Sequence, residues 1–208
     1  MIRVSVLIAS HRSQFLPRAL ASVFAQTLPA AEVQTLVNYS PDPALFRTNW
    51  NDLASIAKGD YLVILGDDDT LEPGYLKAAV ATLDTTGADI AYAQTQGRNG
   101  RGDATGVYVP SSVITLETMR HGNAIWQSSV VRRTTWQAVE GYDMSIPYAH
   151  DYDFWVRCLQ HEARTAYLPM IGWNHYEHDQ GRVTTTTDHA ANWRIFDAKH
   201  VGFRITST

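Results

Sequence analysis

The sequence contains a single cysteine, Cys158, among 208 residues, which excludes an intramolecular disulfide and a multi-cysteine metal site. No apolar run approaches the ~18 residues of a membrane-spanning helix. The opening MIRVSVLIAS is too short and too interrupted to be a signal peptide. The net charge of -4 gives no general attraction to nucleic acid or anionic membranes. We therefore expect a soluble, cytoplasmic protein without a targeting segment.

The residues that are present indicate one compact α/β domain. An apolar fraction of 45% with 18% charged residues is enough for a substantial core. Through residue 96, short aliphatic segments alternate with segments of helical periodicity, in the order β-α-β-α-β-α-β. This order predicts a doubly wound, mostly parallel central sheet flanked by helices, and the second half is expected to be smaller and mixed.

The element boundaries follow from periodicity and from turn residues. Two helix ends have specific predictions: Gly59 as the C-cap of a helix over 49–59, and the DTLE of 69–72 as a capping box for the next helix. We expect 97–106 to be a hairpin tip or loop and 171–187 to be a loop. The remaining expected strands are 3–10, 33–39, 60–66, 88–96, 124–133 and 164–169, and the remaining helices are 15–26, 72–87, 111–122, 134–139, 150–161 and 188–202.

Three polar segments follow the first three expected strands: IASHR, NYSPD and GDDD. Ligands of open α/β sheets bind beyond the carboxyl ends of the strands, so these segments are expected to share one crevice. The aspartates Asp67, Asp68 and Asp69 predict a site for Mg²⁺ or Mn²⁺, because a cation turns the mutual repulsion of carboxylates into attraction. The structural alternative is an acidic loop that caps a helix, and both hold together if Asp69 is the cap.

Four blocks, in order, resemble the family 2 glycosyltransferases. The blocks are VSVLIASHRSQFLPRALASVFAQTL, NWNDLASIAKGDYLVILGDDDTLEPGYL, GYDMSIPYAHDYDFWVRCLQHEARTAYLP and HDQGRVTT. The resemblance implies a single GT-A domain over 1–187, with a nucleotide-sugar-binding half over 1–96 and an acceptor-binding, catalytic-base half over 97–187. A C-terminal helix or tail over 188–208 follows. The implied activity is metal-dependent, inverting transfer from a nucleoside-diphosphate sugar to a hydroxyl acceptor, with Mn²⁺ or Mg²⁺.

The resemblance also implies metal and base residues. Asp68 matches the metal-binding acid of the family's Asp-X-Asp motif, and Asp67 stands in for the first acid, which is Gly66 in this sequence. His178 matches the histidine that completes the metal site, with His175 as the alternative. Asp151 of HDYD matches the general base, and the Glu that precedes it in the family is His150. The alternative role of Asp151 is to cap its helix.

The implied donor site has a departure from the family pattern. Ser10 and His11 occupy positions that line the base pocket, with Arg12 after them. Asn38 replaces the acid that contacts uracil, so UDP is only the default nucleotide. Arg47 matches a basic residue near the diphosphate, and Asn51 lies in the family's Asn-containing helix.

The acceptor cannot be read from the sequence, and we expect a glycan, a lipid-linked sugar, a protein or a modified nucleic acid. Acceptor-side candidates are Trp126, His150, Trp173 and His175, although the aromatic side chains are equally expected in the core. A non-catalytic nucleotide-sugar or glycan binder is the main alternative function. A sugar nucleotidyltransferase is less favoured, because ASHRS has no glycine to hold a triphosphate.

Overall fold

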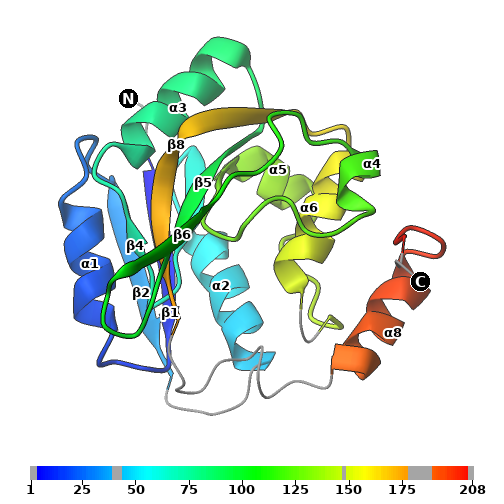
Figure 1. Cartoon of the computed structure of the whole chain (residues 1–208), viewed down its shortest axis with the longest axis horizontal. Coiled ribbons are helices and arrows are strands. Elements are labelled where there is room, and N and C mark those ends of the chain that lie inside the picture. The colour runs from blue at the N-terminus through cyan, green and yellow to red at the C-terminus, as the bar shows by residue number, and fades with distance from the viewer. Residues whose placement is uncertain (1–3, 39–43, 147–148, 178–188, 206–208) are drawn as a thin grey trace.

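The structure is a computed structural model that describes residues 4–38, 44–146, 149–177 and 189–205. In these ranges, eight strands form one mixed sheet in the order β2-β1-β3-β7-β5-β8-β4, with β6 paired to β5 (Figure 1). The strands are β1 Val4–Ser10, β2 Glu32–Val37, β3 Tyr61–Ile64, β4 Thr70–Leu71, β5 Ile90–Arg98, β6 Ala104–Tyr108, β7 Val130–Arg132 and β8 Thr165–Tyr176. The helices are α1 Leu16–Phe24, α2 Ala44–Ile56, α3 Tyr75–Thr86, α4 Leu116–Met119, α5 Arg133–Ala138, α6 His150–Gln160 and α8 His189–Lys199.

Parallel pairing occurs where the chain alternates between strand and helix. β1 pairs in parallel with β2 and with β3, and β5 pairs in parallel with β8. The antiparallel strand β7 lies between β3 and β5, so the third and fourth expected strands are not neighbours. The fold class is confirmed as α/β with a central sheet, and the sheet is mixed because a buried apolar run does not encode the direction of its strand.

The two faces of the sheet carry separate hydrophobic clusters. Along β1, Val4, Val6 and Ile8 pack with residues of α1 and α3, whereas Leu7 and Ala9 pack with residues of α2, α5 and α6. This alternation is the two-residue period of a strand that is buried on both faces. The helices therefore cover both faces, as the doubly wound order predicts (Figure 1).

Two predicted helix ends are wrong. α2 ends at Ile56, and the amide of Gly59 donates instead to Ser5 Oγ at 2.8 Å. A Cβ at Gly59 would lie 2.4 Å from that oxygen, so the glycine permits a close approach of two backbones. α3 begins at Tyr75 after Gly74, which rules out a capping box at 69–72. Tertiary pairing overrides the local signal there, because β4 pairs with β8.

In the second half, the expected elements differ mainly in length. β8 extends to Tyr176, so residues 171–176 of the expected loop are a strand that pairs with β5 and β4. The expected helix over 111–122 is only α4, and the expected strand over 124–133 is only β7. The hairpin is confirmed, with β5 and β6 as its arms. None of the helices in the described ranges has the length and apolar character needed to cross a membrane.

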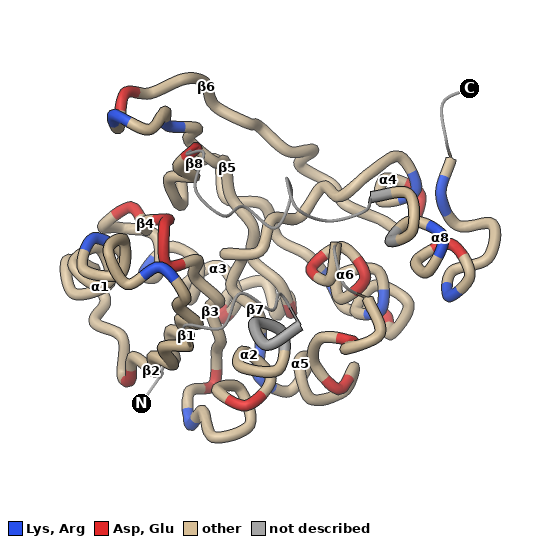
Figure 2. The backbone as a smooth tube through the Cα atoms, turned by 90° about the horizontal axis from the view of Figure 1, so that it is seen from below, with Lys and Arg blue, Asp and Glu red and all other residues tan. Residues whose placement is uncertain are grey.

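The C-terminal helix α8 packs into the core of the domain. The side chain of Phe196 is fully buried, and its ring stacks on that of Tyr152 of α6 with centroids 4.8 Å apart. Beyond the helix, Ile205 donates its amide to the backbone oxygen of Arg120 at 2.9 Å, next to α4. Figure 2 shows α8 beside α4. The expected C-terminal segment is therefore helical over 189–199 and shares the packing of α6.

The contact of β8 with α3 gives a stability prediction. A Cβ at Gly172 would lie 2.7 Å from the buried ring of Tyr75 and 2.8 Å from the Cβ of Ala93. We expect Gly172→Ala to lower the free energy of unfolding by about 1–3 kcal/mol, because neither neighbour can move away cheaply. Gly106→Ala in β6, where the space around the Cβ is open, is the control and should change it by less than about 0.5 kcal/mol. Urea titration measures both, and equal effects would contradict the packing argument.

Candidate active site

Asp67 ties the carboxyl end of β3 to that of β1. Its Oδ2 accepts hydrogen bonds from Ser10 Oγ at 3.0 Å and from the amides of His11 at 3.2 Å and Arg12 at 3.0 Å. Its Oδ1 accepts from Arg12 Nη2 at 2.7 Å. The residue is 2% exposed, and a carboxylate at such a depth requires partners of this kind. The sequence prediction that these two loops meet is therefore confirmed.

Arg12 also neutralises the second aspartate. The same Nη2 lies 2.9 Å from Asp68 Oδ2, so one guanidinium bridges two adjacent carboxylates. Arg18 of α1 donates to the backbone oxygen of Asp68 at 2.7 Å, and its guanidinium lies 3.5 Å from the ring centroid of Tyr176. Figure 2 shows basic positions (blue) next to the acidic stretch (red) between α1 and β4. Arg12 thus offsets much of the repulsion within GDDD.

The third aspartate bonds to β8. Asp69 accepts a hydrogen bond from the amide of Tyr176 at 3.1 Å, and its Oδ1 lies 3.2 Å from His175 Nδ1. Burial raises the pKa of the Asp69 carboxyl, and the adjacent imidazole opposes that change. Asp69 therefore fixes the register of β4 on β8 and has no role as a helix cap.

The metal prediction can be compared with this set of ligands. Within the residues that the structure describes, no group of three or more His, Cys, Asp or Glu side chains is arranged to hold a metal ion. Both oxygens of Asp67 already accept hydrogen bonds, so a cation there would compete with Arg12, and its role as a ligand stays a prediction. The Asp68 side chain is 14% exposed, and a carboxylate is the kind of ligand that suits a Mg²⁺ or Mn²⁺ site completed by substrate phosphates. His178 lies outside the described residues.

Asp151 is placed at the second position of α6 and is partly exposed. Its Oδ2 accepts a hydrogen bond from Asn123 Nδ2 at 2.9 Å, and its Oδ1 accepts from the amide of Tyr152 at 2.8 Å. Burial of the carboxyl raises its pKa to about 6, against the lowering effect of these two donors. Such a group is ionised near neutral pH and accepts a proton there more readily than an ordinary aspartate does.

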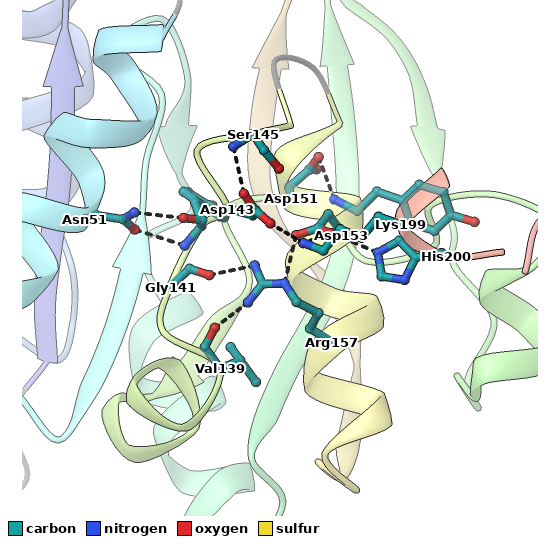
Figure 3. Close-up of polar contacts among 12 residues, drawn as sticks. Asn51, Val139, Gly141, Asp143, Ser145, Asp151, Asp153, Arg157, Lys199 and His200 are labelled. Atoms are coloured by element: carbon teal, nitrogen blue, oxygen red, sulfur yellow. Dashed lines mark hydrogen bonds and ion pairs between the residues drawn. The ribbon is translucent and has the colours of Figure 1, made fainter. Parts of the chain in front are cut away.

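Asp153, two residues along the same helix, lies in a buried ionic cluster (Figure 3). Its Oδ2 accepts from Arg157 Nε at 2.8 Å, and its Oδ1 lies 2.8 Å from both Lys199 Nζ and His200 Nε2. Hydrogen bonds and ion pairs with these three side chains hold the pKa of Asp153 below its usual range despite burial. The cluster joins α6 to the end of α8.

Asn51, which was predicted to contact the donor, bonds to the backbone of a distant segment of the chain. Its Nδ2 donates to the backbone oxygen of Tyr142 at 2.8 Å, and its Oδ1 accepts from the Tyr142 amide at 2.9 Å (Figure 3). Arg157 donates to the backbone oxygens of Gly141 at 2.6 Å and of Val139. Asn51 and Arg157 therefore both anchor the backbone of residues 139–142, which precede α6.

The acceptor-side candidates divide into surface and core residues. Trp126 is partly exposed and contacts the rings of Tyr108 at 5.4 Å and His175 at 5.8 Å. Trp173 is only 4% exposed and contacts the ring of Trp126 edge-on, so it belongs to the core. The imidazole of His150 packs against the rings of Trp50 at 5.4 Å and Tyr142 at 4.8 Å. Trp126 contacts His175, the partner of Asp69, and Asn123, three residues before Trp126, bonds to Asp151. This segment therefore connects the surroundings of Asp69 with those of Asp151.

Two predicted donor residues lie at the border of the described chain. The amide of Asn38 donates to the backbone oxygen of Ser10 at 2.7 Å, which places it beside IASHR. The side chain of Arg47 is outside the described part. Sequence reasoning missed Arg18 and Asn123. The resemblance assigns no role to Arg18, and Asn123 lies outside the four blocks, 28 residues from the carboxylate it contacts.

Comparisons with known proteins agree with this fold. The family model described as "Glycosyl transferase family 2" matches residues 46–135. The crystal structure of S. aureus TarS 1-349 in complex with UDP-GlcNAc is similar with a TM-score of 0.75 and 17% identity, over 95% of this chain and 65% of that chain. The complex of the same protein with UDP has a TM-score of 0.66 and 18% identity, over 95% and 70%.

A third structure of S. aureus TarS 1-349 has a TM-score of 0.66 and 17% identity, covering 84% of this chain and 60% of that chain. The chain therefore spans about three fifths of the length of that structure. A search of curated proteins found no match to this sequence.

The two acids of α6 give opposite stability predictions. The unfolded Asp151 loses its proton near pH 4 and the folded one near pH 6, so ionisation between these values destabilises the fold. We expect Asp151→Asn to raise the free energy of unfolding by about 1–2 kcal/mol at pH 8 and not at pH 4. Asp153→Asn should lower it by about 3 kcal/mol at pH 8, because a guanidinium, an ammonium and an imidazole lose their partner.

Urea titrations at pH 4 and pH 8 measure both variants. The lowered pKa of Asp153 means that its contribution is present above its unfolded pKa and is lost as the pH falls through the folded value. Equal destabilisation by the two substitutions at pH 8 would contradict the difference between these carboxylates.

Proposed function

We propose that this chain transfers a sugar from a nucleoside-diphosphate sugar to a hydroxyl acceptor. The match of the glycosyl transferase family 2 model to residues 46–135 and the GT-A type fold support this proposal. The observation that carries the mechanism is the Asp151 carboxyl. In the described part of the chain its hydrogen-bond donors are neutral N–H groups, and burial raises its pKa to about 6. A second acidic group, GDDD, stands at the edge where the donor loops meet. One site for the base and one for the donor are the two components that single-displacement transfer requires.

The donor half of the proposal uses the carboxyl edge of β1 and β3. Ser10, His11 and Asn38 line the side proposed for the nucleotide base, and UDP is the first nucleotide to test, since the structure of S. aureus TarS similar to this chain holds UDP-GlcNAc. Arg47 is proposed near the diphosphate. Asp68 would hold Mg²⁺ or Mn²⁺ together with the diphosphate, with His178 as a further ligand. When bound, such a cation stabilises the negative charge that develops on the leaving diphosphate.

Asp151 is proposed as the general base of an inverting reaction. The acceptor oxygen attacks the anomeric carbon from the face opposite the diphosphate, a new C–O bond forms, and the bond to the diphosphate oxygen breaks. The acceptor proton moves to the Asp151 carboxylate, and the electron pair of the broken bond leaves with the diphosphate. A single displacement of this kind needs one base and no protein nucleophile.

The acceptor is proposed to approach from the second half of the chain, past Trp126 and His175. The partly exposed rings of Tyr108 and Trp126 offer an aromatic surface beside the Asp69–His175 pair. Sugar rings pack well on aromatic faces, so a glycan is the first class of acceptor to test.

A non-catalytic nucleotide-sugar binder is the second candidate. Gly66 replaces the first acid of the family motif, and Asp67 is occupied by Arg12 and by backbone amides. Slow hydrolysis of a nucleotide sugar in the absence of acceptor would favour the enzyme, whereas donor binding without any turnover would favour the binder.

The first functional prediction concerns the base. We expect Asp151→Asn to lower kcat by about 10²–10⁴-fold while the dissociation constant of the donor stays within about two-fold, because the base acts only in the chemical step. Release of the nucleoside diphosphate measures turnover, and calorimetry measures donor binding. Asp52→Asn, at an exposed position of α2, is the control and should keep full activity. Turnover close to that of the wild type in Asp151→Asn would exclude the base assignment.

The second functional prediction concerns the cation. We expect chelation by EDTA and Asp68→Asn each to weaken donor binding by at least about ten-fold, and added Mn²⁺ to restore it only in the wild type. A thermal-shift titration with nucleotide sugars, with and without Mn²⁺ and Mg²⁺, gives the result without any acceptor. If EDTA does not change the affinity of the wild type for the donor, a metal requirement is excluded.

A further inference from the structure

We propose that Asn123 is a positioning residue for the reaction, which fixes the orientation of the Asp151 carboxyl and favours its ionised form. This inference rests on the proposed role of Asp151 as the base. Nothing in the sequence marks Asn123, which stands in the HGNAIWQSS segment between α4 and β7.

The orientation of the Asn123 amide is determined by its second contact. Its Oδ1 accepts a hydrogen bond from the amide of Ile125 at 3.3 Å, so its Nδ2 must be the group that faces Asp151 Oδ2 at 2.9 Å. Ile125 is fully buried and anchors the segment to the core. The side chain is therefore held between a fixed backbone and the carboxylate, and it presents a donor and not an acceptor.

The electrostatic setting makes this donor important. Among the described residues, Tyr142 in the preceding segment and Asn123 interact with the Asp151 carboxyl. Burial and the negative charge of Asp151 raise the pKa of the Tyr142 hydroxyl. In the described part of the chain, the hydrogen bonds to the Asp151 carboxylate come from neutral N–H groups, those of the Asn123 side chain and of the Tyr152 and Asp151 backbone.

The backbone at the start of α6 does little else to orient the Asp151 carboxyl. Ala149 precedes the helix with a φ of 58°, a left-handed conformation that a residue with a Cβ adopts at a cost, and it makes no side-chain cap. The helix thus starts without a capping side chain, and Asp151 is not needed to satisfy the helix end beyond its bond to the Tyr152 amide. Asn123 is the side chain that decides where Oδ2 points.

A hydrogen bond to the ionised form favours that form. Removal of the Asn123 amide should therefore raise the pKa of Asp151 above its value of about 6 and leave the base protonated at neutral pH. A carboxylate in place of the amide should raise it further, through like charge. A purely structural role for Asn123 predicts lower activity or stability with no such ordered change.

The experiment measures the pH dependence of kcat/KM in the wild type, Asn123→Ala and Asn123→Asp. We expect the acidic limb to move to higher pH by about one pH unit in Asn123→Ala and by more in Asn123→Asp. At pH 6, Asn123→Ala should lose about five-fold in kcat/KM and regain most of it by pH 8.5.

The control is Tyr61→Phe, which likewise removes a neutral donor from a carboxylate, that of Asp84, at the amino end of β3 and away from the site. Its acidic limb should coincide with that of the wild type. An acidic limb that stays at the same pH in both Asn123 variants would overturn the proposal.

A second readout is independent of activity. Carbon-13 NMR of protein labelled at its aspartate carboxyls follows the titration of Asp151, whose signal is assigned by its absence in Asp151→Asn. A higher titration midpoint in Asn123→Ala than in the wild type supports the positioning role, even if no donor and acceptor pair is turned over and the proposed function fails. An unchanged midpoint overturns the positioning role, even if the wild type proves to be a glycosyltransferase.

Discussion

The guanidinium of Arg12, shared between Asp67 and Asp68, is the interaction on which the edge of the sheet depends. Three consecutive aspartates after a buried strand would repel one another, and the repulsion grows as water is excluded. Arg12 lies within 2.9 Å of two of them, and His175 lies beside the third. The backbone amides of His11 and Arg12 complete the partners of Asp67, so the loops after β1 and β3 are held as one unit.

If the proposed function holds, this pairing would affect how a nucleotide-sugar donor binds. A divalent cation at Asp68 alone would lie next to a guanidinium, and two cations at one carboxylate oppose each other. A nucleoside diphosphate bound near Arg12 and the cation would carry enough negative charge to reverse that balance. On the proposed function, the charges would therefore favour joint binding of the cation and the diphosphate over binding of the cation to the free protein. The Arg18 side chain, stacked on Tyr176, adds a further positive group at the same edge.

The sequence predicts the parts of this site that depend on strand ends, and it fails where contacts are distant or strands are short. The meeting of Ser10 with Asp67 followed from the rule that parallel strands end at one edge. Asp69 was expected to cap a helix, yet it bonds to β8, because pairing of two distant segments overrides a local capping signal. β7 has only three residues, too few to show a period. The donor role of Asn51 stays a prediction, and its side chain bonds the Tyr142 backbone, 91 residues away, a contact that no spacing reveals.

The two acids of α6 show why residue type and position alone do not assign chemistry. Asp151 and Asp153 lie on one turn, and both are buried enough to need partners. Asp153 contacts a guanidinium, an ammonium and an imidazole, so its negative charge stabilises the contact between α6 and the end of α8. Among the described residues, the hydrogen-bond donors to Asp151 are amide groups, which leave its carboxylate poorly stabilised and able to take up a proton. The difference lies in the neighbours that the fold brings to each one, and those neighbours come from segments far apart in the chain.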